Sequence, residues 1–225
     1  MEEVKALRRC SNIRLLTIEA DKPSVWNVED ATHIRVSLPA NIQYLYEMQK
    51  MGYQFVERML HVTIPLSKSS IEYDRLIRIK PVALHDHKEE IKEIARSSFT
   101  SDRRFHVTLQ YDQKIANEII DSWIDEINEF YVSEYKGKII GFLALKEQDC
   151  GKCGNIHLAA VDERYRMTGA ALSLYANTVL VGRERGYQRI EGCIASTNMA
   201  VMNLYSYLGA TFSEPVDIYL KEVCQ

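Results

Sequence analysis

The chain has 225 residues, a length that corresponds to one large domain or two small ones. Hydrophobic residues make up 46% and charged residues 26%, a composition that excludes an intrinsically disordered chain. The formal net charge is -3 and the sequence pI is about 6.1, so no global basic field is present to gather phosphate backbones. Nucleic acid is therefore not expected as a partner.

The N-terminal stretch is charged at Glu2, Glu3, Lys5, Arg8 and Arg9. Nothing after it forms the apolar core of a signal peptide, and no uninterrupted apolar run of about 20 residues follows. We expect a cytoplasmic protein without a membrane partner.

The five cysteines are scattered and odd in number, which makes free thiols the default in a chain of this size; they are Cys10, Cys150, Cys153, Cys193 and Cys224. The pattern Cys150-Gly-Lys-Cys153 could be half of a zinc site or a redox pair, but no second Cys/His pair with ligand spacing accompanies it. A tight turn between two strands is the preferred interpretation. No metal is expected.

The first third of the chain predicts a small α/β unit. Its elements are strands at 12–20 and 31–38, a helix at 40–51 and a β-branched and aromatic run at 53–66. A polar stretch then follows Pro65, and we place a domain boundary near residue 72. This gives a small N-terminal α/β domain at 1–72 and a second domain at 73–225.

The second domain alternates strands and helices. The expected order is strand 74–80, helices 86–98 and 113–127, strands 129–135, 139–147 and 154–161, helix 168–185, strand 188–194, helix 198–208 and a final strand pair at 210–222. A meander of antiparallel strands followed by β-α-β crossovers predicts a mixed sheet that is covered by helices.

The most informative segment is 161–171, where a strand ends, the chain turns and a long helix begins. The first backbone N–H groups of a helix lack intrahelical partners and, with the helix dipole, can bind a pyrophosphate. Gly169 and the small Ala170 and Ala171 would allow an anion to approach closely. A glycine near a helix start is more often only a turn, so on these residues alone both interpretations stay open.

Two segments together resemble a known family. Segment 166–171, Arg-Met-Thr-Gly-Ala-Ala, resembles the (Gln/Arg)-x-x-Gly-x-(Gly/Ala) signature of the GNAT superfamily of acetyltransferases. Segment 198–209, Asn-Met-Ala-Val-Met-Asn-Leu-Tyr-Ser-Tyr-Leu-Gly, is similar to the Asn-x-x-Ala-x-x-Leu-Tyr-x-x-x-Gly stretch of that superfamily. The two motifs have the order and separation that the family shows, and the resemblance covers about residues 74–225.

The resemblance implies an enzyme that transfers the acetyl group of acetyl-coenzyme A to a primary amine. It also implies an α/β fold of the GNAT type, with a mixed, mostly antiparallel sheet flanked by helices, here preceded by the small N-terminal α/β unit. In the family the cofactor is held by main-chain and side-chain groups at the matching positions; here they are Leu158, Ala159, Ala160, Val161, Arg166, Met167, Thr168, Gly169, Ala170, Ala171, Asn198 and Tyr205.

A narrower resemblance concerns the acceptor. The stretch 101–106, Ser-Asp-Arg-Arg-Phe-His, and the later Trp123-Ile124 are similar to segments of the acetyltransferases that act on TDP-4-amino sugars. This implies a nucleotide-linked amino sugar as acceptor. The residues expected to contact it are Arg103, Arg104, Phe105 and His106. A guanidinium matches phosphate oxygens, although a solvated charged loop is the simpler interpretation of the two arginines.

Three residues are candidates for proton transfer. Tyr205 occupies the family position whose phenol lies beside the thioester sulfur, and a phenol with a pKa near 10 can protonate a thiolate; it could also simply pack on an apolar helix face. His157 lies where many members carry a glutamate base, and a pKa near 6.5 suits that role as well as a structural histidine. His106 is the second candidate for the base.

Other functions stay open on the sequence. A protein or small-amine acetyltransferase would need a different acceptor cleft, and a non-catalytic acyl-CoA-binding module could keep the fold without the activity. The sequence leaves a homodimer open as well.

Overall fold

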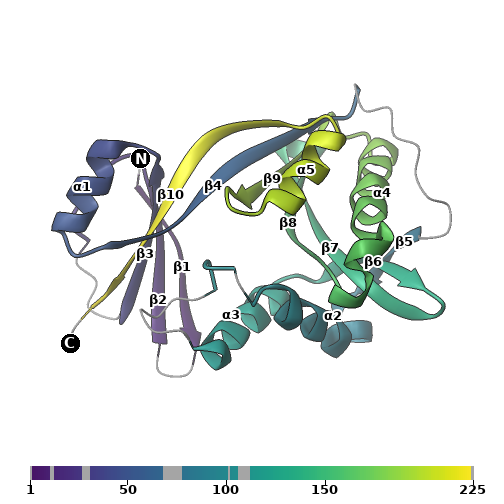
Figure 1. The fold of residues 1–225 in the computed structure, drawn as a ribbon, viewed down its shortest axis with the longest axis horizontal. Coiled ribbons are helices and arrows are strands. Elements are labelled where there is room, and N and C mark those ends of the chain that lie inside the picture. Colours follow the sequence, from purple (N-terminus) through teal and green to yellow (C-terminus); the bar gives the residue numbers. More distant parts are fainter. Residues whose placement is uncertain are drawn as a thin grey trace.

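The computed structural model describes residues 2–10, 13–26, 31–67, 78–100, 102–105 and 112–223. In this part of the chain ten strands form one sheet, in the order β1-β2-β3-β10-β4-β9-β8-β7-β6-β5 (Figure 1). Only β2 with β3 and β8 with β9 pair in parallel. The expected mixed, mostly antiparallel sheet flanked by helices is therefore confirmed.

The N-terminal elements match the prediction, with one addition. They are β1 (Glu2–Cys10), β2 (Ile13–Ala20), β3 (His33–Pro39), α1 (Ile42–Lys50) and β4 (Gln54–Pro65). Helix α1 begins where the Asn41 side chain accepts a hydrogen bond from the Gln43 amide at 2.8 Å. Strand β1 was not expected, because its charges mask the strand pattern. It is an edge strand, where charged residues are common.

The elements that follow are β5 (Arg78–Ala83), α2 (Leu84–Ser98), α3 (Gln113–Asp125), β6 (Glu129–Tyr135), β7 (Lys138–Gln148), β8 (Cys153–Val161), α4 (Ala170–Glu184), β9 (Arg189–Ala195), α5 (Met199–Tyr207) and β10 (Thr211–Glu222). The predicted strand 74–80 is β5; its first residues lie outside the described part of the chain, as does the boundary near residue 72. The division into two domains remains a prediction.

Two of the expected elements differ in the structure. The helix predicted at 168–185 begins at Ala170, because a separate 3-10 turn, η2 (Glu163–Thr168), precedes it and Gly169 lies between them with a φ of 80°. The strand pair predicted at 210–222 is instead the single strand β10. A bulge between Ser213 and Val216, where Glu214 has a φ of 49°, interrupts its pairing with β4 and mimics a turn in the sequence.

The Cys-Gly-Lys-Cys stretch forms the expected turn between two strands. The short helix η1 (Asp149–Gly151) joins β7 to β8, and Cys150 has a φ of 51°. Cys150, Cys153 and Cys193 are free thiols. Among the described residues, no helix is long and apolar enough to cross a membrane.

Strands from both ends of the chain meet in the middle of the sheet. Strand β10 pairs with β3 on one edge and with β4 on the other, and β4 in turn pairs with β9. Ile13, Leu15 and Leu220 share a buried cluster with α2 and α3, which we call the α2–α3 core. A second cluster packs α4 and α5 on the opposite face and is called the α4–α5 core. Figure 1 shows these helix pairs on opposite sides of the central strands.

Candidate active site

Strands β8 and β9 part in the middle of the sheet. Their parallel pairing runs from Cys153 and Arg189 to Ile156 and Gly192 and ends there, although both strands are described beyond that point. The other edge of β8 stays paired with β7 as far as Val161. The edge of β8 beyond Ile156 therefore faces a gap. Such an edge can bind an extended ligand through main-chain hydrogen bonds, which is the role predicted for Leu158 to Val161.

Tyr205 lies where the two strands part. It sits on α5, and its side chain is 3% exposed. A Cβ atom built on Gly192 would lie 3.2 Å from the Tyr205 hydroxyl and 3.5 Å from the carbonyl oxygen of Ile156. The absence of a side chain at Gly192 thus leaves the space that the phenol oxygen occupies. No pattern in the sequence indicated this role of Gly192.

Helix α5 is fixed at its start by Asn198. The Asn198 side chain accepts a hydrogen bond from the Val201 amide at 3.3 Å. The structure thus gives Asn198, which was predicted as a cofactor contact, the role of a helix cap. Through this cap it helps to set the position of Tyr205.

A second tyrosine contacts Tyr205 from the neighbouring helix. Tyr175 lies on α4, and the two rings meet edge to face with centroids 5.2 Å apart. Burial raises the pKa of Tyr205 well above its usual value and the pKa of Tyr175 to about 12, while the positive charge of Arg104 opposes both shifts. Tyr205 therefore holds its proton at neutral pH, as a general acid must.

His157 lies on the other side of the gap. The pairing of β7 with β8 shifts between Ala144 and Leu145, and this bulge makes His157 an additional residue of β8. Its exposed side chain stacks on Trp123 of α3, with ring centroids 5.8 Å apart and an angle of 28° between the planes. Since Trp123 packs against the α2–α3 core and Tyr205 belongs to the α4–α5 core, the predicted base and acid flank the gap from opposite faces.

The turn before α4 has an open backbone suited to an anion. Gly169 has a φ of 80°, a Cβ built on it would meet nothing within 4 Å, and no side chain caps the helix. Met167 is 98% exposed, and Arg166 donates from Nε to the Val161 carbonyl at 3.4 Å. Free amides with space in front of them fit a pyrophosphate. The residues 166–171 thus have the geometry that their predicted role requires.

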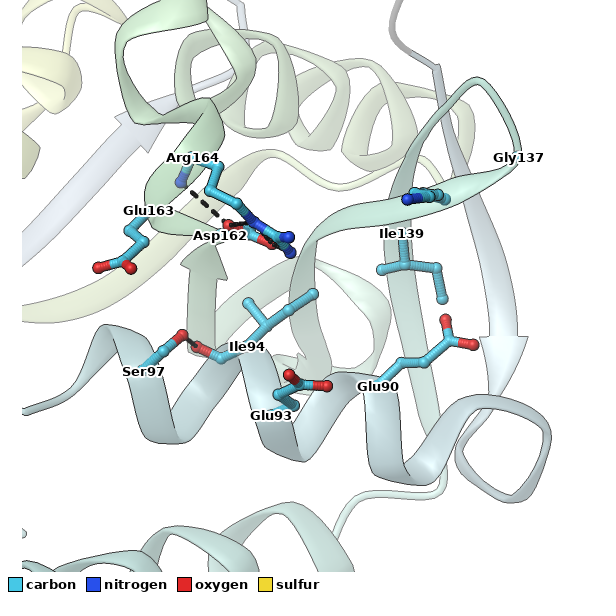
Figure 2. Close-up of a pocket in the computed structure, with 10 residues that line it drawn as sticks. Glu90, Glu93, Ile94, Ser97, Gly137, Ile139, Asp162, Glu163 and Arg164 are labelled. Carbon is cyan, nitrogen blue, oxygen red and sulfur yellow. Dashed lines mark hydrogen bonds and ion pairs between the residues drawn. The ribbon is translucent and has the colours of Figure 1, made fainter.

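The same turn borders a hollow of about 430 Å³ on its α2 side (Figure 2). Glu90, Glu93 and Glu163 line it with Lys138, and Asp162 is paired there with Arg164, so that carboxylates outnumber the cations. This concentration of acidic groups disfavours phosphate in the hollow. The anion is therefore expected at the start of α4, and the Asp162–Arg164 pair serves to hold the turn.

The arginines predicted to contact the acceptor lie between α2 and α3. The Arg104 side chain is 18% exposed, and its Nε donates to Asp102 Oδ1 at 2.9 Å. Arg35 of β3 donates to the Arg104 carbonyl oxygen. Arg103 is exposed and lies 3.4 Å from the Val56 carbonyl. Arg104 is thus a fixed charge whose field reaches Tyr205, whereas Arg103 faces solvent.

Phe105 anchors this loop in the α2–α3 core. It is fully buried in the α2–α3 core and packs edge to face on Trp123 at 5.0 Å. A direct contact with the acceptor is therefore not its role in this arrangement. His106 lies outside the described residues.

Several charged residues near the gap come from distant strands and were missed in the sequence. Glu57 of β4 is 4% exposed and accepts a hydrogen bond from Thr197 at 3.0 Å. Burial raises the pKa of Cys193 on β9; the charge of Arg104 opposes this, and carboxylates reinforce it. These carboxylates belong to Glu19, Glu191 and Glu214. No local pattern links these residues, because the sheet brings together strands that are far apart in the chain.

A gap between two parallel strands, a buried phenol beside it and an open helix start at α4 suit an acyltransferase that uses coenzyme A. Residues 88–210, more than half of the chain, match the model of the acetyltransferase (GNAT) family. The chain therefore belongs to the GNAT acetyltransferase family. Its acyl donor is acetyl-coenzyme A and its acceptor is an amine.

Solved structures support the same fold. A GCN5-related N-acetyltransferase from Sphaerobacter thermophilus has a TM-score of 0.59 at 19% identity, over 84% of this chain and 59% of that longer one. One from Kribbella flavida has a TM-score of 0.59 at 13% identity, over 93% of this chain and 82% of the other. A conserved protein of unknown function from Staphylococcus epidermidis has a TM-score of 0.63 at 15% identity, over 86% and 74%. None of the curated proteins matches this chain.

Proposed function

We propose that this enzyme transfers acetyl directly to the amine, with Tyr205 as the general acid. The observation that carries the proposal is the buried Tyr205 phenol at the β8–β9 gap, in the space left by Gly192. A thiolate leaving group needs a proton donor at that place, since the thioester arm would run along the free edge of β8.

The proposed roles of the chain's residues follow from their positions. The bound donor supplies the acetyl thioester; the amine nitrogen forms the new C–N bond while the C–S bond breaks. His157, held by Trp123 on the acceptor face, takes the amine proton directly or through a water molecule. Tyr205 gives its hydroxyl proton to the sulfur from the opposite face. Proton exchange with solvent then restores both groups.

We further propose a nucleotide-linked amino sugar as the acceptor. Arg103 is exposed, and Arg104 uses Nε and Nη2 on Asp102, so that its Nη1 has no partner among the described residues. Two guanidinium groups on one loop suit a diphosphate. Support for this acceptor also comes from the loop's position on the His157 side of the sheet, where an acceptor would enter.

A cationic amine, such as a peptide N-terminus or a polyamine, is the second candidate acceptor. It is favoured by the negative charges of Glu19, Glu191 and Glu214, which all act on Cys193 next to Gly192, although Arg189 pairs with Glu191. Carboxylates beside the gap would attract a cation and repel a diphosphate.

The test is a panel of amines with acetyl-coenzyme A, followed by the release of free thiol. TDP- and UDP-amino sugars represent the first candidate, and peptides and polyamines the second. A tenfold higher kcat/KM, about 1.4 kcal/mol, for either group decides between them. If acetyl-coenzyme A stabilises the protein but no amine in the panel is acetylated, both proposed acceptor classes are wrong.

A further inference from the structure

Arg35 is a buried cation on β3 whose side chain reaches a loop of the candidate active site. The residue is 6% exposed, and its Nη2 donates a hydrogen bond to the carbonyl oxygen of Arg104. A charged side chain is costly to bury, and the cost is offset only where partners compensate it. We infer that Arg35 is a positioning residue, which fixes the loop 102–105 and thereby holds the Arg104 guanidinium beside the β8–β9 gap.

The loop is held by the core beneath it and by two N-terminal strands. Phe105 packs in the α2–α3 core, and Arg103 donates from Nη1 to the Val56 carbonyl of β4 at 3.4 Å. Arg103 is exposed, so its bond competes with water. The bond from Arg35 is shielded from solvent and ends on the main chain of Arg104 itself. It therefore fixes the backbone from which the Arg104 side chain extends.

Strand β3 lies outside the residues 88–210 that match the family model. In the pairing of β3 with β10, Arg35 lies opposite Leu220, a residue of the α2–α3 core. The side chain of Arg35 thus leaves the sheet on the face that carries the loop. The N-terminal strands then do more than extend the sheet, because they hold a loop of the transferase region.

The charges around the loop balance one another. Burial raises the pKa of Asp102, and the charges of Arg104 and Arg35 lower it, with a net decrease. The charge of Glu57, buried on β4, acts on Arg104 as well. Two cations therefore face two carboxylates. Loss of Arg35 would remove a bond to the loop and leave a net negative charge beside Arg104.

The field of Arg104 extends to the gap. Burial raises the pKa of Cys193 and of Tyr205, and the charge of Arg104 opposes both shifts. Cys193 directly follows Gly192, where the pairing of β9 with β8 ends. A positive charge held there favours the negative charge that develops on a departing thiolate. The inference rests on the proposed function, since the acetyl group would be transferred at this gap.

The experiment follows the exposed thiol of Cys193 with iodoacetamide. Only the thiolate reacts, so the dependence of the alkylation rate on pH reports the pKa of Cys193, and the plateau at high pH reports access to the thiol. Arg35→Met should displace Arg104 and slow alkylation at pH 8 by about threefold without changing the plateau. Arg104→Met should slow it at least as much. In the Arg104→Met background, Arg35→Met should change the rate by less than about 1.5-fold.

Three variants and a second thiol serve as controls. Arg35→Lys keeps a cation and a donor and should retain at least about half of the wild-type rate. Arg183→Met removes the same kind of contact at the other end of β4, where Arg183 donates to the Leu66 carbonyl at 3.0 Å, and should leave the rate unchanged. If Arg35→Met does not fold, Arg35→Gln, which is polar but uncharged and shorter, has the same expected result. Alkylation of the exposed Cys150, in the turn between β7 and β8, should not change in any variant.

Steady-state kinetics link the position of Arg104 to the reaction. With the panel amine that is acetylated fastest, Arg35→Met should lower kcat by about three- to tenfold, less than the loss of a direct donor, because the charge acts from a distance. KM for acetyl-coenzyme A should stay within about twofold. An unchanged kcat in Arg35→Met would overturn the positioning role.

The alkylation results decide the inference separately from the proposed function. Unchanged alkylation of Cys193 in Arg35→Met would overturn the inference. Equal slowing by Arg35→Met in the wild-type and Arg104→Met backgrounds would show that Arg35 acts through its own charge, and would overturn it as well. If the wild type acetylates no amine of the panel, the proposed acceptors are wrong, while alkylation of Cys193 still shows whether Arg35 holds Arg104 at the gap.

Discussion

The two faces of the sheet at the β8–β9 gap are built in opposite ways. The α4–α5 face is apolar, and its two reactive groups are the phenols of Tyr175 and Tyr205. The α2–α3 face carries charged groups, among them the Asp102–Arg104 pair in the loop between the two helices. On the α4–α5 face, burial keeps the Tyr205 phenol protonated. On the α2–α3 face, charged side chains are held in ion pairs.

The two faces also depend on different parts of the chain. Tyr175, Tyr205 and the cofactor turn lie in a single stretch of chain between β8 and α5. The charged face needs strands from both ends of the chain, because β4 is inserted between β9 and β10. Donor chemistry is thus local in the sequence, while recognition of the acceptor depends on the assembled sheet.

The largest effect is expected on the phenol face. Tyr205→Phe removes the proton donor but keeps the ring in its core, so kcat should fall by on the order of 10² to 10⁴, while the melting temperature and acetyl-coenzyme A affinity change little. Steady-state kinetics and a thermal melt measure both. If chemistry limits turnover, kcat and kcat/KM should fall together. Near-normal turnover in a folded variant would leave water as the proton donor.

The second prediction concerns the cofactor turn. At about 100 times its dissociation constant, acetyl-coenzyme A should stabilise the wild type by roughly 2.7 kcal/mol, a shift in Tm of about 5 to 10 °C for a chain of this size. Gly169→Val should abolish the shift, because a β-branched side chain at positive φ distorts the turn and occupies the open space.

Gly137→Val is the control for that experiment. Gly137 also has a positive φ, 76°, with nothing within 4 Å of its built Cβ, but it lies in the β6–β7 turn beside the acidic hollow. Its cofactor-dependent shift should survive the same backbone strain. If Gly137→Val instead loses the cofactor-dependent shift in Tm, the cofactor's phosphates bind in the hollow and not at the start of α4.

Much of the fold could be predicted because its signals are local. The helix and strand periods, the stop at Gly52 and the turn at Cys150 all lie within one element or between two neighbours. The missed strand β1 and the bulge in β10 have no such local signal. Their structure depends on where the strand lies in the sheet, at an edge for β1 and beside β4 for β10.

The residues of the candidate site show the same distinction between local signals and long-range contacts. Tyr205, His157 and the turn at Gly169 could be proposed from a resemblance, and their roles stay predictions. The ring contact of Tyr175 with Tyr205 and the space at Gly192 could not, because both depend on contacts between separate elements. The sequence also could not show that Arg104 is held by a carboxylate.

A smaller effect, on stability, is expected from the charged face. The pKa of Asp102 is lowered: burial raises it, but Arg104 lowers it more. The ionised Asp102 therefore stabilises the fold fully at pH values above its unfolded pKa, near 4. This stabilisation is lost as the pH falls through the lower pKa of Asp102 in the folded protein. In Arg104→Met the effect of burial on the Asp102 pKa is no longer offset by the guanidinium, so this pKa should rise. The buried Asp102 carboxylate should then destabilise the fold at neutral pH.

The measurement is urea unfolding of both proteins between pH 7 and pH 4. At pH 7 the variant should be less stable by on the order of 2 kcal/mol, below the value for a fully buried pair because the two side chains are 18% and 15% exposed. The difference should shrink toward pH 4 as the unpaired Asp102 takes up a proton. Arg164→Met is the comparison: Arg164 lowers the pKa of Asp162 in the same way but is 76% exposed, so a pH-dependent difference of the same sign and smaller size is expected. A constant difference across the pH range would contradict the assignment to Asp102.

The smallest effect is expected at Gly192, where the two faces meet. Gly192→Ala would place a methyl group 3.2 Å from the Tyr205 hydroxyl, closer than an ordinary contact, and the phenol oxygen would have to move by a few tenths of an ångström. Because proton transfer depends on that position, kcat should fall by about tenfold, while KM for acetyl-coenzyme A stays nearly constant. The same substitution in Tyr205→Phe should cause no further loss, since the oxygen that the methyl group would displace is absent. Unchanged kcat in Gly192→Ala alone would mean that the Tyr205 oxygen does not lie at the reacting sulfur, whereas an equal loss in both backgrounds would locate the damage in the sheet.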